Sequence, residues 1–245
     1  MEIKPKILLF DIETSPHLSY NWGKYEQNAL AFKSYGGLLC FAWKWIGKDT
    51  THVLGLPHVK SEKQLLLRLK ALLDRADVVI AHNGASFDVK MVNGFFAHHK
   101  IKPPSPYKVI DTKVVAKRHF RFVSNKLDDL GDYLHLGRKI QTGGMNLWFD
   151  CMKGDKKAWA KMLKYNKQDV ILLEKVYLCL RPYMDNHPNY NVLLNRPSSC
   201  PNCGGRTLNT RGWNITRVAR SRRYQCSDCG AWSHGKYEKL KVEIR

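Results

Sequence analysis

The stretch that decides the fold is "KILLFDIETS", residues 6–15. Residues 6–12 form a short apolar run that is typical of a buried strand. The run ends in Asp11 and Glu13, and side chains two residues apart on a strand point to the same face of the sheet. Two such carboxylates repel each other unless a proton or a cation lies between them. The stretch therefore predicts a strand that can carry a metal-binding pair, although taken alone the same pattern is more often a solvated strand end.

Further strands and helices follow from the patterns on both sides of this stretch. Apolar runs predict four more strands, at residues 36–47, 51–56, 77–84 and 108–112. Helical periodicity predicts helices at residues 61–76, 86–100 and 125–137, and one or two helices within 154–184. Ser61 and Gln64 form a capping-box pattern at the start of the first of these helices. Strands that first follow one another and then alternate with helices predict an α/β domain with a mixed sheet.

The composition changes near residue 185. Residues 186–196 are rich in Asn and Pro and are typical of a linker. We therefore expect one domain at residues 1–185 and a second, small domain at residues 197–245. From Arg196 to Arg245 there are 11 Lys and Arg but 3 Asp and Glu, so this end of the chain carries +8 of the net charge of +20.

The net charge of +20 predicts a polyanionic partner, most often a nucleic acid. No apolar run reaches 18 residues, so no membrane-spanning helix is expected. The first residues lack the pattern of a signal peptide. Three cysteines stand alone in apolar surroundings, which suits a reducing compartment. We expect a cytoplasmic protein, in a bacterial cell or a phage-infected host.

Three more candidate site residues lie far from the first strand. Asp88 ends "HNGASFD", residues 82–88, where a strand, a glycine turn and a helix start follow one another. Tyr165 and Asp169 lie in "YNKQD", residues 165–169, four apart and hence on one face of a helix. Each pattern by itself also occurs without a functional role. An acid at a helix start is favoured by the helix dipole, and a Tyr–Asp pair with this spacing usually lies on the protein surface.

The order of these motifs resembles the DnaQ-like DEDDy 3′–5′ exonuclease family, which has a ribonuclease H-like fold. "FDIET", "HNGASFD" and "YNKQD" are similar to its three motifs, and the resemblance extends over about residues 5–182. Tyr165 stands four residues before Asp169, as in the Tyr branch of the family. The resemblance implies a mixed five-stranded sheet flanked by helices and a 3′–5′ exonuclease that hydrolyses phosphodiester bonds.

The resemblance also implies roles for particular residues. Two Mg²⁺ or Mn²⁺ ions would be held by the four carboxylates, with Asp11 bridging them, Glu13 and Asp169 on the ion that activates water, and Asp88 supporting the other. Tyr165 would orient the attacking water, since an unperturbed Tyr pKa near 10 makes it a poor base. Around the terminal nucleotide the family implies substrate contacts from Thr14, Asn83 and Phe87.

A four-cysteine cluster near the end of the chain predicts a zinc site. Cys200 and Cys203 form one C-x-x-C-G knuckle, and Cys226 and Cys229 form another. This spacing indicates one structural Zn²⁺ in a module that resembles a zinc ribbon. The segment between the knuckles combines cations for phosphates with an aromatic ring for bases. The expected nucleic-acid contacts there are Arg211, Trp213, Arg217, Arg220, Arg222 and Arg223.

Other interpretations stay open. A structure-selective endonuclease on the same fold would carry similar acids, and a non-catalytic nucleic-acid-binding protein would share the basic module. The segment between the knuckles could instead be a solvated basic hairpin, or it could contact a protein. DNA is favoured over RNA as the partner, and a polymerase or another replication or repair protein acting in trans is a further expectation, with no membrane partner.

Overall fold

The computed structural model describes residues 5–25 and 28–239. Within these residues the chain forms two compact units. One consists of Lys6–Val114 with Phe122–Val176, and the other of Val115–Arg121 with the chain from Tyr177 onward. Residues 186–196, for which the sequence predicts a linker, include the short helix α7 (Tyr190–Leu193). The division into residues 1–185 and 197–245 stays a prediction.

The first unit is built on a five-stranded sheet with the order β5-β4-β1-β6-β7. The strands are β1 (Ile7–Thr14), β4 (Leu38–Trp45), β5 (His52–Gly55), β6 (Val78–Ala81) and β7 (Lys108–Asp111). β1 pairs antiparallel with β4, and β4 with β5, whereas β1, β6 and β7 are parallel. The predicted mixed five-stranded sheet is confirmed. A separate two-stranded sheet of β2 (Leu18–Tyr20) and β3 (Ala31–Ser34) was not predicted.

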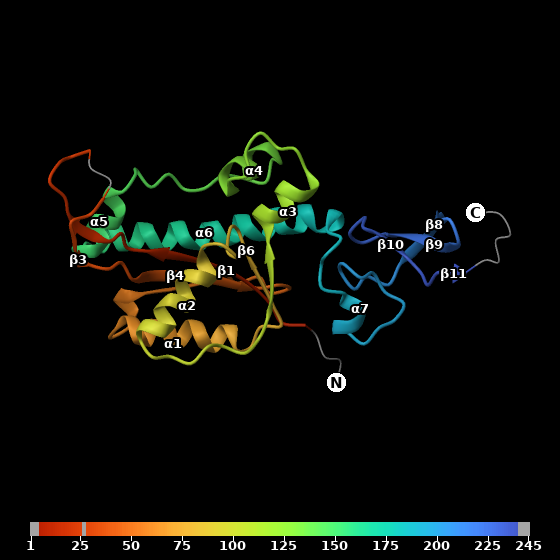
Figure 1. Cartoon of the computed structure of the whole chain (residues 1–245), viewed down its shortest axis with the longest axis horizontal. Helices are drawn as coiled ribbons and strands as arrows, with labels where there is room; N and C mark the ends of the chain where they lie inside the picture. Colours follow the sequence, from red (N-terminus) through yellow and green to blue (C-terminus); the bar gives the residue numbers. More distant parts are fainter. Residues whose placement is uncertain (1–4, 26–27, 240–245) are drawn as a thin grey trace. The chain divides into compact units, whose positions relative to one another are not determined.

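Helices cover both faces of this sheet. Besides α7, the helices within the described residues are α1 (Glu62–Leu73), α2 (Asp88–His98), α3 (Thr112–His119), α4 (Leu127–Tyr133), α5 (Asn146–Met152) and α6 (Lys156–Leu180), with 3₁₀ turns η1 (Leu56–His58) and η2 (Arg181–Tyr183). Figure 1 shows α1 and α2 on one face of the sheet and α6 along the other. At the start of α1, Ser61 Oγ accepts a hydrogen bond from the N–H of Gln64, as the capping-box pattern predicts.

Alternation along β1 sends its side chains to two different cores. Leu8, Phe10 and Ile12 are buried in the cluster that also contains apolar residues of α1 and α2. Glu13 lies opposite Cys40, which belongs to the cluster formed with α5 and α6. The acidic side chains of β1 therefore face α6. This placement explains how an acid on α6 can reach the acids on β1.

The second unit contains an antiparallel sheet, here called the ribbon sheet. Its strands are β8 (Leu208–Ile215), β9 (Ala219–Cys226), β10 (Trp232–His234) and β11 (Glu238–Lys239). β9 pairs with β8 along one edge and with β10 and β11 along the other. Asn202, in the first cysteine knuckle, donates its amide to the carbonyl oxygens of Arg181 and Met184, both at 3.1 Å. These two hydrogen bonds tie the knuckle to the turn after α6.

The buried apolar cluster of the ribbon sheet is small. It consists of Cys200, Cys226 and Ala231, with three partly buried neighbours. So few buried side chains stabilise a fold weakly. Among the described residues, no helix is both long and apolar enough to cross a membrane.

Candidate functional site

Four carboxylates gather where the parallel strands of the sheet end. Asp11 and Glu13 lie on β1, and Asp169 reaches them from α6; one oxygen of each lies within 4.8 Å of the others. Asp88 is the first residue of α2, directly after the loop that follows β6. Its Oδ1 accepts a hydrogen bond of 3.2 Å from the backbone N–H of Ile12, so it contacts the same strand. The structure thus brings together acids separated by up to 158 positions of the sequence.

Crowding and burial raise the pKa values of these acids. Burial, followed by the charges of Asp88, Glu13 and Asp169, raises the pKa of Asp11 well above its usual range. Burial and the neighbouring Asp169 raise the pKa of Glu13 to about 8. Burial raises the pKa of Asp88 to about 6, and it also raises the pKa of Asp169. Protein atoms alone therefore leave the negative charges of this cluster poorly compensated.

The donor set fits divalent cations. Carboxylate oxygens are the ligands that Mg²⁺ and Mn²⁺ prefer. A cation among the three close oxygens would favour the ionised form of each acid and so reverse the repulsion that raises the pKa values. Asp88 is 3% exposed and Asp169 is 1% exposed, whereas Asp11 and Glu13 keep part of their surface accessible. The cluster is therefore buried on one side and open to a ligand on the other.

Lys139 is a cation within the cluster that sequence reasoning missed. Its Nζ lies 2.6 Å from Oδ2 of Asp169 and donates a hydrogen bond of 3.1 Å to the hydroxyl of Tyr165. Burial lowers the pKa of Lys139, but the neighbouring Asp169 and Tyr165 outweigh it, and the net direction is upward. Lys139 therefore stays charged and compensates part of the negative charge.

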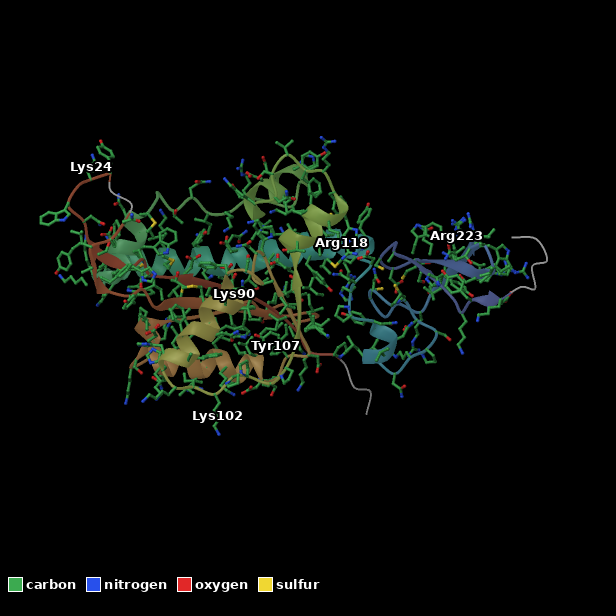
Figure 2. The ribbon with its side chains drawn as sticks, in the orientation of Figure 1. Lys24, Lys90, Lys102, Tyr107, Arg118 and Arg223 are labelled. Carbon is green, nitrogen blue, oxygen red and sulfur yellow. The ribbon has the colours of Figure 1, made fainter. Side chains whose placement is uncertain are left out.

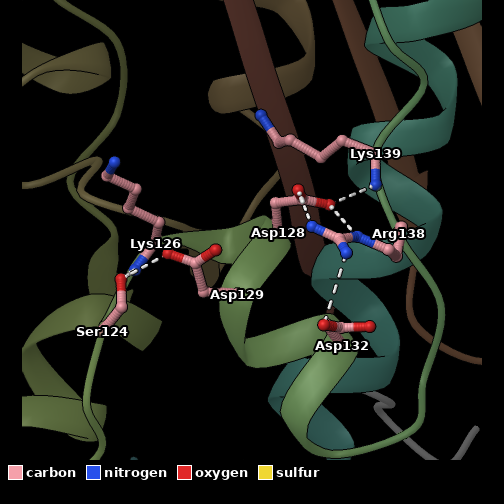
Figure 3. Close-up of polar contacts among 7 residues, drawn as sticks. All are labelled: Ser124, Lys126, Asp128, Asp129, Asp132, Arg138 and Lys139. Atoms are coloured by element: carbon pink, nitrogen blue, oxygen red, sulfur yellow. Dashed lines mark hydrogen bonds and ion pairs between the residues drawn. The ribbon is translucent and has the colours of Figure 1, made fainter.

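The helix α4 holds Lys139 in place. Asp128 of α4 accepts hydrogen bonds from the backbone N–H of Lys139 at 2.7 Å and from Nη2 of Arg138 at 2.9 Å (Figure 3). Asp132, one turn further along, also pairs with Arg138. The position of Lys139 thus depends on contacts with α4, because it lies in an irregular segment with no local pattern of its own.

Tyr165 lies beside the acids with its hydroxyl protonated. Burial, and then the charge of Asp169, raises the pKa of Tyr165 above its usual value. The ring meets Trp148 edge to face, with centroids 6.2 Å apart. Trp148 belongs to α5, which was not predicted, and it also forms a hydrogen bond that lowers the pKa of Glu13. The Tyr165 hydroxyl can therefore donate or accept a hydrogen bond, but it does not act as an ionised base.

Asn166 positions the carboxylate of Asp11. Its Nδ2 donates to Oδ2 of Asp11 at 2.7 Å and lies 3.3 Å from the backbone oxygen of the same residue. The thiol of Cys40 lies 3.7 Å from Oδ1 of Asn166, so both ends of the amide have partners. Asn166 stands within "YNKQD", one residue after Tyr165, and this adjacency was the available signal for it.

The loop between β6 and α2 is held by Asp111. Oδ1 of Asp111 accepts the backbone N–H of Asn83 at 2.9 Å, and Asn83 has a φ of 68°. Oδ1 of Asn83 accepts hydrogen bonds from Nζ of Lys113 at 3.1 Å and from the hydroxyl of Ser86 at 2.9 Å. The side-chain oxygen of Asn83 therefore already accepts hydrogen bonds from within the protein.

The other predicted substrate contacts of this unit keep accessible surface. Phe87 is 42% exposed and directly precedes Asp88, and Thr14 is partly exposed and follows the bulge after Glu13. Both ring nitrogens of the neighbouring His82 are used, at 2.9 Å from Thr112 Oγ1 and from the carbonyl oxygen of Asn125. His82 is therefore a structural histidine, whereas the ring of Phe87 is available to a ligand.

The four cysteines form a cluster that fits zinc. One Sγ of each lies within 4.8 Å of the others, and the pairs Cys200–Cys229 and Cys203–Cys226 are both 3.7 Å apart. A tetrahedral site with Zn–S bonds of about 2.3 Å has sulfur atoms about 3.8 Å apart. These separations are far longer than a disulfide bond of about 2.05 Å. The glycine after each knuckle, Gly204 or Gly230, has a φ of 76°, as the tight turn requires.

The predicted nucleic-acid contacts of the ribbon sheet differ in their surroundings. Arg220 and Arg222 lie over the ring of Trp213, at 4.3 and 3.8 Å from its centroid. Arg223 donates from Nε to the carbonyl oxygen of Arg211 at 3.2 Å. The side chains of Arg211 and Arg217 are exposed. The structure therefore gathers these cations on one small sheet and on the turn between β8 and β9, although Trp213 is already covered by two of them.

The fold and the acidic edge of its sheet define a ribonuclease H-like protein. A family model described as the RNase H superfamily matches residues 38–181, more than half of the chain, and the chain belongs to this superfamily. No match to a curated protein sequence was found. The match begins at β4, so Asp11 and Glu13 lie before it.

Among solved structures, the chain is similar to the family B DNA polymerase of the hyperthermophilic archaeon Pyrobaculum calidifontis. The TM-score is 0.53 and the sequence identity is 12%. The similarity covers 74% of this chain and 26% of the polymerase. At this identity the similarity shows the fold, and the chain corresponds to a minor part of the polymerase's length.

Proposed function

We propose that the protein is a metal-dependent 3′–5′ exonuclease. The observation that carries this proposal is the convergence of Asp11, Glu13 and Asp169 with Asp88 and Tyr165. These residues come from three motifs that resemble those of DEDDy exonucleases, in the same order. Membership of the RNase H superfamily and the similarity to a DNA polymerase support a nucleic-acid substrate.

The roles follow from the contacts within the cluster. Asp11, Glu13 and Asp169 would hold the ions, and Asp88 would support the second. Bound in this way, a pair of divalent cations supplies charge stabilisation for the phosphoryl group and a lower pKa for the attacking water. Asn166 fixes the direction of the Asp11 carboxylate. Tyr165 keeps its proton and orients the water through its hydroxyl, while Lys139 fixes that hydroxyl through a hydrogen bond.

In the same proposal, the ribbon sheet binds nucleic acid through its cations, and one structural Zn²⁺ held by the four cysteines stabilises it. A second binding module on the same chain raises the local concentration of substrate. Replacing the exposed Arg217 by Gln would reduce the number of phosphate contacts by one. We expect the dependence of binding on salt to become less steep by about one ion. An unchanged slope would assign Arg217 no phosphate.

The test of the exonuclease is a gel assay with 5′-labelled single-stranded DNA and RNA. Reactions contain Mg²⁺, Mn²⁺ or neither, and zinc is retained throughout because a strong chelator would also strip the cysteine site. The expected result is a metal-dependent ladder that shortens from the 3′ end and is absent in Asp11→Ala. Cleavage of a closed circular strand would instead indicate an endonuclease. Intact substrate under every condition, with folded protein, would leave only nucleic-acid binding.

A further inference from the structure

Trp232 and Trp213 lie on opposite faces of the ribbon sheet. Trp232 pairs with Gln225 of β9, and Trp213 pairs with Arg222 of the same strand. Gln225 and Arg222 are three positions apart, and residues an odd number apart on a strand point to opposite faces. The two tryptophans therefore face two different surfaces.

The two rings differ in how much of their surface is available. Two guanidinium groups lie over Trp213, and Arg220 is held further by an ion pair of 3.3 Å with Glu238. Trp232 is 53% exposed, and its neighbour Arg223 lies 5.8 Å from its centroid, near the outer limit of a cation–π contact. A flat ligand can stack on Trp232 without displacing an arginine, whereas at Trp213 it has to displace one.

Trp232 lines a cavity of about 310 Å³. The other lining residues are Asn214, Arg223, Ser233 and His234. Arg223 is fixed through its Nε by the carbonyl oxygen of Arg211, so the remaining N–H groups of its guanidinium can contact an anion. Figure 2 shows the side chain of Arg223 on the part of the chain that forms the ribbon sheet. The cavity thus combines an exposed indole, a positioned cation and polar groups.

This combination matches the chemistry of an unpaired nucleotide. A base offers a flat π surface to an aromatic ring, and its phosphate offers oxygen atoms to an arginine. Charge complementarity also favours a polyanion, since residues 196–245 carry 11 basic against 3 acidic side chains. We propose that this cavity binds one unpaired base of a single strand, with Trp232 as the stacking surface and Arg223 as the phosphate contact. The proposal rests on the nucleic-acid-binding role of the ribbon sheet.

The experiment measures binding by the full chain in an Asp11→Ala background, with zinc but without Mg²⁺ or Mn²⁺, so that the strands stay intact. The probes are a labelled single-stranded DNA oligonucleotide and the same backbone with abasic sites. We expect Trp232→Ala to weaken binding of the base-bearing strand between about 5-fold and about 100-fold, and to leave the abasic strand unaffected. Trp232→Phe restores most of the difference because it keeps an aromatic face.

Ile215→Ala is the matched control on the opposite face, because Ile215 pairs with Arg220 of β9 and is 74% exposed, and it should keep the preference for the base-bearing strand. One bound zinc per chain shows that each variant has folded its ribbon. Equal binding of both probes by the parent chain, or an unchanged affinity in Trp232→Ala, would overturn the stacking site and leave the binding role of the ribbon in place. Failure to bind either probe would overturn both. The exonuclease is tested separately, on the chain that retains Asp11.

Discussion

The side-chain amide of Asn166 donates a hydrogen bond of 2.7 Å to Oδ2 of Asp11. Asn166 is fully buried on α6, and Asp11 lies on β1, so this bond connects the last motif with the first. One lone-pair direction of the Asp11 carboxylate is used by the amide. The rest of the carboxylate is thereby aimed at the neighbouring acids, where a cation would bind.

Replacing Asn166 by Ala should weaken metal-dependent cleavage more than it weakens folding. Groups that orient a metal ligand typically contribute about 10-fold to 100-fold in metal affinity or activity. We therefore expect the Mn²⁺ concentration for half-maximal cleavage to rise by a factor in this range. The measurement is a cleavage rate on single-stranded DNA against metal concentration.

The matched control is Lys167→Ala on the next residue of α6, which is exposed. This control should leave the metal dependence unchanged. An Asn166→Ala protein with the metal dependence of the parent chain would show that Asp11 needs no partner to hold its direction.

The stability of the metal-free protein should fall as the pH rises. The folded pKa of Glu13 is raised from 4.5 to about 8, and that of Asp88 from 3.8 to about 6. A raised folded pKa contributes stability that is present below the unfolded value and is lost as the pH rises through the folded value. Because of this contribution, we expect the Tm of the metal-free protein to decline as the pH rises from about 5 to about 8.

Divalent metal should reverse this decline. Cations bind ionised carboxylates, so the increase in Tm on adding Mn²⁺ should be larger near pH 8 than near pH 5. Thermal unfolding at both pH values, with and without Mn²⁺, measures the difference. Glu13→Gln removes the acid whose pKa rises from 4.5 to about 8 and should flatten the profile. A Mn²⁺ effect that does not depend on pH would contradict the assignment of these acids as ligands.

Lys139→Met should destabilise the metal-free protein and increase its response to metal. The ammonium group forms an ion pair of 2.6 Å with Asp169 and donates a hydrogen bond to the Tyr165 hydroxyl, and the loss of a hydrogen bond from a charged group costs about 2 kcal/mol. Without this cation, Mn²⁺ has no protein charge to compete with at Asp169. The gain in Tm on adding Mn²⁺ should therefore exceed that of the parent chain, and Lys139→Arg should behave as the parent does. An equal gain in Lys139→Met would show that Lys139 and the metal do not share Asp169.

Much of the fold could be predicted because its elements carry local patterns. The five strands of the large sheet coincide with apolar runs, and Ser61 with Gln64 marks the start of α1. Because Asp11 and Glu13 are two residues apart on one strand, the sequence predicts that their side chains lie close together on the same face of the sheet. Their proximity to Asp169 could be inferred only from the resemblance, because no local rule joins the two ends of a domain.

The elements that were missed lack such patterns. The strands β2 and β3 are exposed along their whole length, so they show no alternation of buried and exposed side chains. α5 has neither an acidic residue in its first turn nor a side-chain cap, so no start signal marks it, whereas the equally short α4 begins with Asp128 and Asp129. Lys139 reaches the site because Asp128 holds its backbone, and a contact between distant segments leaves no trace in the local sequence.

Gly84 and Gly94 should respond to Ala in opposite ways. A Cβ at Gly84 would lie 2.3 Å from Cβ of Ala81 and 3.7 Å from Oδ2 of Asp88, so the loop that positions this acid has to shift. We expect Gly84→Ala to cost about 1–3 kcal/mol in the free energy of unfolding, the usual range for overpacking, and to slow cleavage.

Gly94 lies within α2, and a Cβ there meets no atom within 4 Å. Gly94→Ala should therefore stabilise the protein by about 0.5–1 kcal/mol through helix propensity. Denaturant unfolding of both variants gives the two free energies, and a stable, fully active Gly84→Ala protein would show that the loop can move without displacing Asp88.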